Sequence, residues 1–266
     1  MTRRRLDAEL VRRGLARTRT EAQEAVRNGL VVVGGRPTSK PSTLVRQDEP
    51  LRLAGPPRRY VSRGGEKLDA ALERFGVGVA GRDALDAGAS TGGFSDCLLQ
   101  RGAARVVAVD VGYGQLAWEL RLDSRVAVLE RTNVRDLVPA DLPFIPQVVA
   151  ADLSFISLRL VLPALADVAM EGADLVLLVK PQFEAGPKDV GAHGVVRDPN
   201  VWRRALEGVV AACEASGAMP DLAMASPLLG PAGNVEFFIH AVKGGLAKSP
   251  DLDGAIAEGK GIGGGS

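Results

Sequence analysis

The sequence predicts an α/β protein with two domains: a small N-terminal α+β domain and a larger domain built on a doubly wound, mostly parallel sheet. Strand-like apolar runs alternate with helical patterns between residues 64 and 243, and a glycine-rich turn follows the first strand. Charge also separates the two domains. Residues 1–63 hold 15 lysines and arginines against 6 acidic residues, a net charge of +9, and the remaining residues carry a net charge of −8.

The domain boundary is predicted at a basic segment that contains two prolines. Residues 54–59 read Ala-Gly-Pro-Pro-Arg-Arg, a composition typical of a stiff linker. Beyond residue 243 the chain is rich in glycine and has no clear packing pattern. We therefore predict a first domain over residues 1–55, a linker over 56–63, a second domain over 64–243 and a disordered tail over 244–266.

Composition excludes several classes of protein. The chain has 266 residues, of which 46% are hydrophobic, enough for a sizeable core. Its two cysteines and two histidines show no disulfide framework and no metal-ligand spacing, so no metal site is predicted. It has no secretory signal and no apolar run long enough to span a membrane. We expect a cytoplasmic protein without membrane contact, and a monomer is compatible with the sequence.

The first domain is predicted to contain two short helices followed by strands. The first helix covers residues 6–13 and ends at Gly14, and the second opens with Thr18 and Glu21 at capping-box spacing. Strands follow at 30–33 and 51–53. A concentrated basic patch is typical of a partner with a phosphate backbone, although a solvated charged face would have the same composition. Residues 3 and 4 are predicted to form a flexible basic arm.

The glycine-rich stretch 85–94 predicts a nucleoside cofactor site. It reads as strand, tight loop and helix, and a second strand about twenty residues on ends in Asp110, where a ribose would be bound. Its D-x-G-x-x-x-G-G order suits S-adenosylmethionine (SAM) better than a dinucleotide, although an ordinary strand-to-helix turn is the alternative. Asn133 could read an adenine edge or simply cap a turn. The candidate cofactor contacts are Asp86, Gly88, Ala89, Ser90, Thr91, Gly92, Gly93, Phe94, Asp110 and Asn133.

Four ionisable residues are predicted to meet at the carboxyl edge of the sheet, where open α/β sheets bind ligands. Asp152 and Lys180 follow two successive strands, Glu236 lies in the last hairpin, and Lys67 is predicted near a helix start. For methyl transfer to a ribose hydroxyl, we assign Lys180 as the base that takes the proton. Lys67 would be its electrostatic partner and a second substrate contact, with Asp152 and Glu236 as orienting acceptors. Spacing alone favours the alternative of two structural ion pairs.

Other methyl acceptors fit the sequence less well. Methylation of base amino groups commonly uses Asn or Asp followed by Pro-Pro and an aromatic residue, whereas this chain has Asp-Leu-Ser-Phe at 152–155. Carbon-5 methylation of pyrimidines needs a cysteine nucleophile, and Cys97 and Cys213 both lie in predicted helices. The alternating pattern predicts a Rossmann-like methyltransferase, and methylation of oxygen remains.

Motifs along the chain resemble two known families. R-L-D-x-x-L-V at 5–11, T-R-x-x-A at 18–22 and G-L-V-V-V-G-G at 29–35 resemble the S4 RNA-binding domain. The second domain is similar to the TlyA (hemolysin A) family, and the combined match covers residues 3–242. The motifs that carry it are Y-V-S-R-G-G-x-K-L at 60–68, D-A-G-A-S-T-G-G-F at 86–94, D-V-G-Y-G-Q-L at 110–116, A-D-L-S-F-I-S-L at 151–158, V-K-P-Q-F-E at 179–184 and G-N-V-E-F-F at 233–238.

The resemblance implies SAM-dependent 2′-O-methylation of cytidines in ribosomal RNA of one or both subunits. It implies a Lys-Asp-Lys-Glu tetrad like that of FtsJ-type enzymes, which Lys67, Asp152, Lys180 and Glu236 match one for one. It also implies that RNA faces four basic residues of the first domain. Two other classes stay open: an inactive RNA-binding assembly factor and a cytolysin. The implied RNA contacts are Arg5, Arg17, Arg19 and Lys40.

Overall fold

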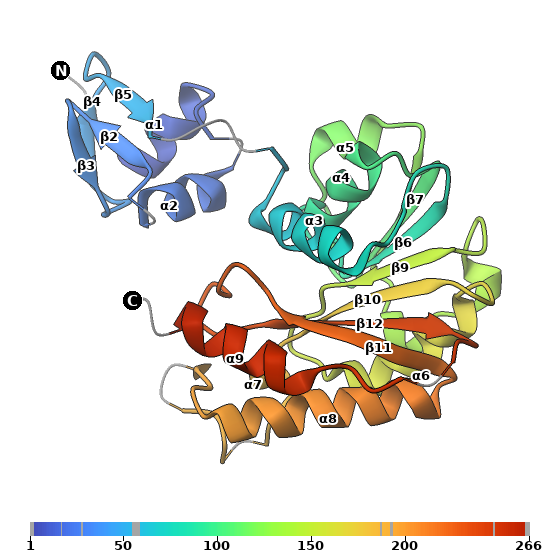
Figure 1. Cartoon of the computed structure of the whole chain (residues 1–266). Coiled ribbons are helices and arrows are strands. Elements are labelled where there is room, and N and C mark those ends of the chain that lie inside the picture. The colour runs from blue at the N-terminus through green and yellow to red at the C-terminus, as the bar shows by residue number, and fades with distance from the viewer. Residues whose placement is uncertain are drawn as a thin grey trace. The chain divides into compact units, whose positions relative to one another are not determined.

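The fold is described from a computed structural model of the whole chain (Figure 1). It describes residues 3–16, 18–27, 29–54, 59–186, 188–191, 194–246 and 248–263. The chain forms two compact units, Met1–Arg58 and Arg59–Ser266, each of which is described by itself. The division falls within the linker predicted over residues 56–63.

The first unit packs two helices against short strands. Its core contains apolar residues that recur at helical spacing in α1 and α2, including Leu6, Leu10 and Val26, together with Val31 and Val45 from the strands. Thr18 Oγ1 accepts a hydrogen bond from Glu21 N at 3.1 Å, so the predicted cap of α2 is present. The elements are β1 (Arg3–Arg5), α1 (Leu6–Arg12), α2 (Arg19–Arg27), β2 (Val31–Val33), β3 (Arg36–Thr38), β4 (Leu44–Arg46) and β5 (Leu51–Leu53).

The predicted flexible arm at residues 3 and 4 is wrong, because these residues belong to strand β1. This strand pairs antiparallel with β4, and Arg3 lies opposite Arg46. Consecutive arginines are typical of a solvated arm, because they have no apolar side chain to bury. Here the backbone of β1 pairs with β4, while the three arginine side chains stay exposed. Two arginines opposite one another repel, so this ribbon concentrates positive charge at the surface.

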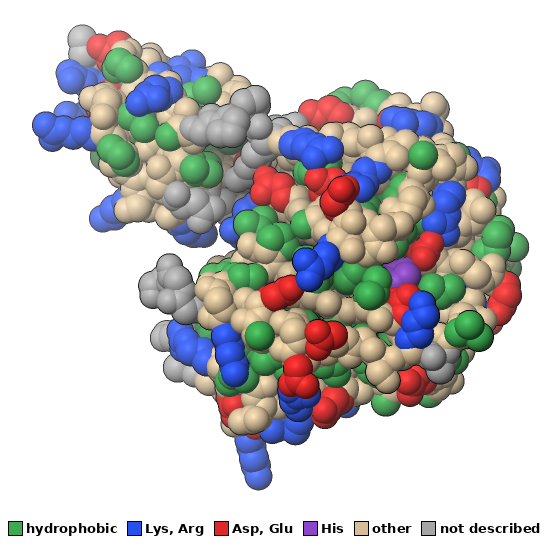
Figure 2. Space-filling model, in the orientation of Figure 1, with side chains coloured by type: hydrophobic (Ala, Val, Ile, Leu, Met, Phe, Trp, Pro, Cys, Tyr) green, Lys and Arg blue, Asp and Glu red, His purple; other side chains and the backbone are tan. Residues whose placement is uncertain are grey.

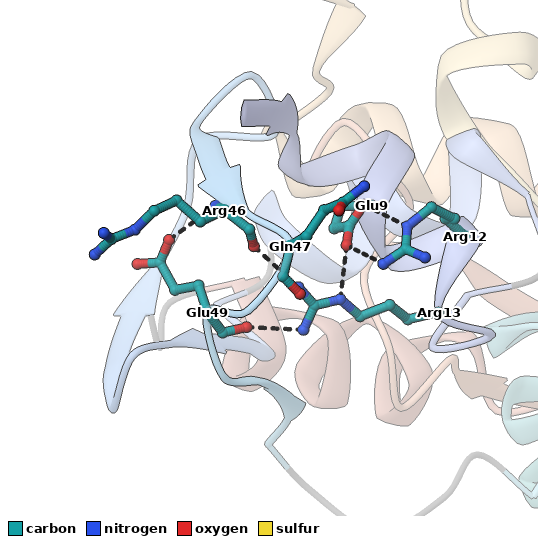
Figure 3. A network of polar contacts seen from close by, with 6 residues as sticks. All are labelled: Glu9, Arg12, Arg13, Arg46, Gln47 and Glu49. Atoms are coloured by element: carbon teal, nitrogen blue, oxygen red, sulfur yellow. Dashed lines mark hydrogen bonds and ion pairs between the residues drawn. The ribbon is translucent and has the colours of Figure 1, made fainter. Parts of the chain in front are cut away.

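Arg13 joins α1 to the turn between β4 and β5 (Figure 3). Its guanidinium donates to the carbonyl oxygens of Glu49 at 2.7 Å, Gln47 at 2.8 Å and Arg46 at 3.0 Å. Its Nε donates to the buried carboxylate of Glu9 at 2.8 Å, which also accepts from Arg12. Arg13 therefore ties α1 to the turn between β4 and β5, whereas Arg12 pairs with Glu9 within the helix, so part of the basic charge of the first unit is structural.

The second unit is built on a seven-stranded sheet in the order β11-β12-β10-β9-β6-β7-β8. The strands from β6 to β10 are parallel, whereas β12 lies antiparallel between β10 and β11 (Figure 1). This arrangement confirms the predicted α/β class with a late antiparallel hairpin. The strands are β6 (Asp83–Ala87), β7 (Arg105–Asp110), β8 (Val126–Glu130), β9 (Val148–Ala151), β10 (Asp174–Val179), β11 (Ala218–Ala225) and β12 (Phe237–Lys243).

Helices cover both faces of this sheet because the strands are apolar on both sides. One face packs against α3, α4 and α5, and the other against α6, α8 and α9. The residues that alternate along β6 show this division, since Ala84 faces the first layer and Leu85 the second. The helices are α3 (Arg63–Phe75), α4 (Gly93–Gln100), α5 (Trp118–Leu122), α6 (Leu158–Val168), α7 (Pro181–Glu184), α8 (Pro199–Ala215) and α9 (Leu252–Gly263), with 3₁₀ turns η1 (Val134–Asp136) and η2 (Pro139–Asp141).

Helix α3 begins four residues before Lys67, so this lysine lies in the second turn, near the helix start as predicted. Ser62 caps the helix and accepts a hydrogen bond from Gly64 N at 3.3 Å. The two glycines allow close packing and do not break the helix. A Cβ on Gly65 would lie 2.3 Å from the ring of Tyr60. Tyr60 itself is buried in the core of the second unit, inside the predicted linker.

The prediction of a disordered tail over 244–266 is wrong for residues 252–263, which form α9. This helix buries Ala255 and Ile256 in the core that also contains Phe237. Gly259 permits the close contact, since a Cβ there would lie 3.0 Å from Val235 Cγ1 and from Phe237 Cε1. Helix α9 therefore supports the segment that leads into β12.

His240 joins three strands at the interior of the sheet. Its Nε2 lies 2.8 Å from Asp174 Oδ1 and its Nδ1 lies 2.5 Å from Asp221 Oδ1. Asp221 sits at a bulge in β11, and Asp174 also binds Arg82 at 2.6 Å. Burial alone would lower the pKa of His240, but hydrogen bonds and attraction from the two carboxylates outweigh burial, so the pKa is raised.

We expect this raised pKa to make the free energy of unfolding depend on pH. The stabilisation is complete below pH about 6.5, the ordinary histidine pKa, and is lost as pH rises through the higher folded-state pKa of His240. Each pH unit between the two values is worth about 1.4 kcal/mol. Urea unfolding from pH 6 to pH 9 should show this decline in the wild type and a flatter profile in His240→Gln. Identical profiles would contradict the assignment.

Candidate functional site

Lys67 and Glu236 form a buried ion pair at one end of the sheet. Lys67 Nζ lies 2.5 Å from Glu236 Oε2, and the two side chains are only 8% and 1% exposed. Lys67 comes from α3, and Glu236 immediately precedes β12. The other carboxylate oxygen, Glu236 Oε1, is buried and has no hydrogen-bond partner within the described residues. A buried acceptor of this kind is rare in a structural pair and is suited to a ligand hydroxyl or water.

Lys180 and Asp152 form a second, more accessible ion pair. Lys180 Nζ lies 2.6 Å from Asp152 Oδ1, but the two atoms are poorly aligned for a hydrogen bond. The ammonium instead donates to Ser154 Oγ at 2.9 Å. The side chains of Lys180 and Asp152 are 11% and 25% exposed, so the pair is open to a substrate at the surface.

The register of the sheet brings both pairs to the same edge. Ala151 pairs with Leu177, so Asp152 and Lys180 follow neighbouring parallel strands. Val179 pairs with Phe237 in the antiparallel strand, which places Glu236 beside Lys180. The four residues predicted from the sequence therefore converge. Each lysine contacts an acid, although the sequence predicted that Lys67 would act mainly on Lys180.

The glycine-rich loop packs directly against this edge. A Cβ on Gly88, whose φ is 89°, would lie 2.5 Å from the carbonyl oxygen of Asp152. Glycine is therefore required where the loop meets the segment after β9. Gly92 and Gly93 are needed for packing as well, since a Cβ would lie 2.2 Å from Leu120 and 2.1 Å from Ser62 Oγ, respectively.

Asp86 lies beneath the loop and is completely buried. Its Oδ2 accepts hydrogen bonds from Ser95 N at 2.8 Å and Ser95 Oγ at 2.6 Å. Burial raises the pKa of Asp86 to about 7, against the lowering effect of these hydrogen bonds. The structure thus places Asp86 where it orders the loop and the start of α4. Phe94 is also buried and stacks with Phe238 at 6.4 Å between ring centres.

Asp110 borders a hollow beside the loop. Its Oδ2 accepts from Ser90 N at 2.8 Å and its Oδ1 from Gly112 N at 2.6 Å. Each oxygen keeps a lone pair, so the carboxylate can still accept hydrogen bonds from a ribose. Glu130 and Gln115 also line this hollow, although neither was predicted as a cofactor contact, and Glu130 ends β8 opposite Asp110. The hollow is lined by Ala89, Ser90, Ala108, Asp110, Gly112, Gln115, Leu116, Val128 and Glu130.

Two other predicted cofactor contacts, Asn133 and Thr91, accept hydrogen bonds from backbone N–H groups of the protein itself. The exposed Asn133 caps η1, and its Oδ1 accepts from Arg135 N at 3.1 Å. It does not line the hollow, so the geometry matches the turn-capping alternative. Thr91 is exposed, and its carbonyl oxygen accepts from Ala117 N at 3.1 Å.

An exposed aromatic side chain packs on Phe183, whose ring lies near Lys180. Phe155 is 91% exposed and has a positive φ of 64°, unusual for a residue with a bulky side chain. Its ring lies 5.3 Å from that of Phe183, and Lys180 Nζ lies 5.9 Å from the Phe183 ring. Both phenylalanines lie in the family motifs at 151–158 and 179–184, but the sequence predicted no role for either side chain. The strained backbone of Phe155 is not visible in the sequence.

Three of the four predicted RNA contacts gather near the start of α1. The buried Asp7 carboxylate lies 2.9 Å from Arg5 Nη2 and 3.4 Å from Arg19 Nη2. Asp7 N donates to Pro41 O at 3.1 Å, which brings the segment containing the exposed Lys40 beside this site. Hydrogen bonds from Arg5 lower the pKa of Asp7, so it stays charged and orders both arginines. Arg17 lies outside the described residues.

Basic side chains predominate over acidic ones on the visible face of the first unit (Figure 2). On the second unit, the two charges are mixed in the same view. Over the described ranges, no helix is long and apolar enough to cross a membrane. In the same parts of the chain, no three acidic, histidine or cysteine side chains form a group that could hold a metal ion.

Comparison with known proteins identifies the family. Residues 60–243 match the FtsJ-like methyltransferase family, and residues 4–50 match the S4 domain. The chain is 54% identical over 236 residues, 88% of each chain, to the 16S/23S rRNA (cytidine-2'-O)-methyltransferase TlyA of Mycobacterium tuberculosis. The chain belongs to the TlyA family of FtsJ-like methyltransferases.

Other members of the TlyA family share this architecture. The chain is 34% identical over 186 residues to the 23S rRNA (cytidine-2'-O)-methyltransferase TlyA of Campylobacter jejuni, covering 69% of this chain and 71% of that one. A solved structure of a candidate hemolysin from Streptococcus thermophilus is 40% identical, with a TM-score of 0.79. That alignment covers 98% of this chain and 97% of the other, so it includes both units and α9 of this TlyA-family chain.

Proposed function

We propose that this chain transfers a methyl group from SAM to the 2′-oxygen of a cytidine ribose in ribosomal RNA. The observation that carries this proposal is the convergence of the Lys67–Glu236 and Lys180–Asp152 pairs beside the glycine-rich loop. The relatives that act on cytidine ribose support the same reaction. The substrate is 16S RNA, 23S RNA or both, within ribosomal subunits, and we place the enzyme in the cytoplasm.

The loop and hollow fit SAM. Asp110 offers free lone pairs for ribose hydroxyls, and the hollow next to it has apolar walls that include Leu116 and Val128. The glycines bring backbone close to the segment after β9, so a ligand in the loop would lie near Asp152. Bound SAM supplies an electrophilic methyl group on a positively charged sulfur, which leaves as a neutral thioether.

Lys180 is the proposed base. To act as a base, the Lys180 ammonium must first release a proton to solvent. The neutral amine would then take the proton of the ribose hydroxyl and make that oxygen nucleophilic toward the methyl group that SAM would supply, so the weakly acidic hydroxyl need not ionise beforehand. Asp152 and Ser154 hold the amine in position through contacts of 2.6 and 2.9 Å. Lys67, held by Glu236, orients the ribose, and proximity supplies much of the rate enhancement.

Phe155 is the proposed contact for the target base. An unpaired base stacks readily on an aromatic ring, and RNA enzymes read bases that have left the helix. The exposed Phe155 ring presents such a surface beside Lys180, and Phe183 supports it. Stacking there would fix the ribose attached to that base near the amine.

The first unit would position the RNA by contacting the phosphate backbone of the RNA. We expect Lys40→Ala to weaken RNA binding uniformly and to reduce the slope of log K against log salt concentration by about 1, because one phosphate contact is lost. Lys40 is a cleaner test than Arg19, whose guanidinium also binds Asp7. Filter binding across a salt series measures the slope. Lys260→Ala, an exposed lysine on α9, serves as the matched control, and equal slopes for the two variants would argue against the contact.

Mapping of ribose methylation tests the proposal as a whole. Ribosomal RNA from cells with and without the gene should differ at specific cytidines, and purified protein with SAM should restore the missing methyl groups. Restoration of ribosome assembly without any methyl group would instead favour an inactive assembly factor. Lysis of red cells by purified protein without SAM would favour a cytolysin.

A further inference from the structure

The segment after β9 and the segment after β10 are joined at several successive points. Near the reacting groups, Lys180 contacts Asp152 and Ser154. Further along the two segments, Phe183 packs on Phe155. The contact furthest along from the reacting groups is made by Glu184, the last residue of α7.

Glu184 is a buried acid, only 8% exposed, and its hydrogen bonds reach the start of α6. Its Oε1 accepts from Leu158 N at 2.7 Å, and its Oε2 accepts from Ser157 Oγ at 2.5 Å. Arg159 donates to the carboxylate at 3.2 Å and to the carbonyl oxygen of Glu184 at 3.0 Å. A negative charge is favourable here, since the first N–H groups of a helix lack partners within the helix.

The hydrogen bonds of Glu184 at the start of α6 also fix the end of the segment that leads there from Asp152. Residues 153–156 connect Asp152 to the start of α6 and carry Ser154 and Phe155, the latter with a backbone φ of 64°. Such a conformation persists only where surrounding contacts impose it. The segment is fixed at one end by β9 and at the other by the hydrogen bonds to Glu184.

We propose that Glu184 is a positioning residue for methyl transfer, which it supports by holding Ser154 and Phe155 in place beside Lys180. This inference rests on the proposed function. Glu184 lies at the far end of α7 from Lys180 and acts through the segment it anchors. An error of about 1 Å in such a segment can cost on the order of 100-fold in rate.

The experiment compares Glu184→Ala with Glu184→Gln in the full-length protein, with SAM and ribosomal RNA as substrates. Glu184→Ala should lower kcat by roughly 10- to 100-fold while the KM for SAM changes less than about twofold, because Glu184 anchors the end of the segment at Ser157 and Leu158, whereas Gly88 of the loop contacts its other end at Asp152. Glu184→Gln keeps one acceptor oxygen for Leu158 N and should recover kcat to within about threefold of wild type.

Asp251→Ala is the matched control, since Asp251 caps α9 through a 2.9 Å hydrogen bond from Gly254 N and lies outside the site. All rates are measured well below the unfolding midpoint of each variant. A wild-type kcat in Glu184→Ala, or a parallel loss of kcat and SAM affinity, would overturn the positioning role. Absence of methyl transfer by the wild type would instead refute the proposed function.

Discussion

Replacement of Lys180 by alanine is expected to abolish methyl transfer while RNA binding persists. General-base catalysis contributes roughly 10²- to 10⁴-fold, so single-turnover rates with radiolabelled SAM should fall by at least that range. RNA binding should survive, because the basic residues assigned to it lie in the first unit. Wild-type turnover by this variant would eliminate Lys180 as the base.

Lys180→Arg separates charge from proton transfer. An arginine keeps a positive charge opposite Asp152, but its guanidinium does not lose a proton at accessible pH. We expect it to be nearly as inactive as the alanine variant. Lys248→Ala is the matched control. Lys248 is an exposed lysine that also lies near a carboxylate, 3.7 Å from Asp221, but Asp221 pairs with His240 and is not one of the four proposed site residues. Full activity of Lys180→Arg would show that the site needs only a cation there.

Loss of Lys67 is expected to affect both stability and activity. Lys67→Met leaves the carboxylate of Glu236 buried without its partner, and breaking a buried ion pair in this way costs about 3–5 kcal/mol of unfolding free energy. Urea unfolding measures the stability, and methyl transfer at a temperature where the variant is folded measures the activity. Both should fall.

The double variant Lys67→Met/Glu236→Gln decides between a structural and a catalytic pair. It removes both charges and keeps their approximate volumes, which is often neutral for stability. Most of the unfolding free energy should therefore return, whereas methyl transfer should remain lost. Recovery of activity together with stability would mean that this pair is structural, the alternative that residue spacing left open.

Much of the fold was predictable because buried strands and amphipathic helices leave a strong pattern. The helix predicted over residues 6–13 is present in the structure as α1, Leu6–Arg12. Helix α9 was missed because its glycines disfavour an isolated helix. Gly259 is instead required by contacts with Val235 and Phe237, which no local pattern reveals.

The candidate site was predictable to the extent that strand ends meet at one edge. Asp152 and Lys180 follow neighbouring strands, so their proximity followed from the fold class alone. The pairing of Lys67 with Glu236 depended on the antiparallel register of β12, which the sequence does not encode locally. Asp86 was predicted as a cofactor contact because it begins the glycine-rich motif, but its side chain points beneath the loop to Ser95.

The position of β12 between β10 and β11 has a consequence for biosynthesis. Lys67 and Glu236 are 169 residues apart, so a nascent chain must extend past residue 236 before this pair can form. Until β12 arrives, β10 has an unpaired edge, which exposes backbone groups to other strands. Strand β12 therefore completes both the sheet and the proposed catalytic groups, and a chain that stopped before β12 would be inactive and prone to aggregate.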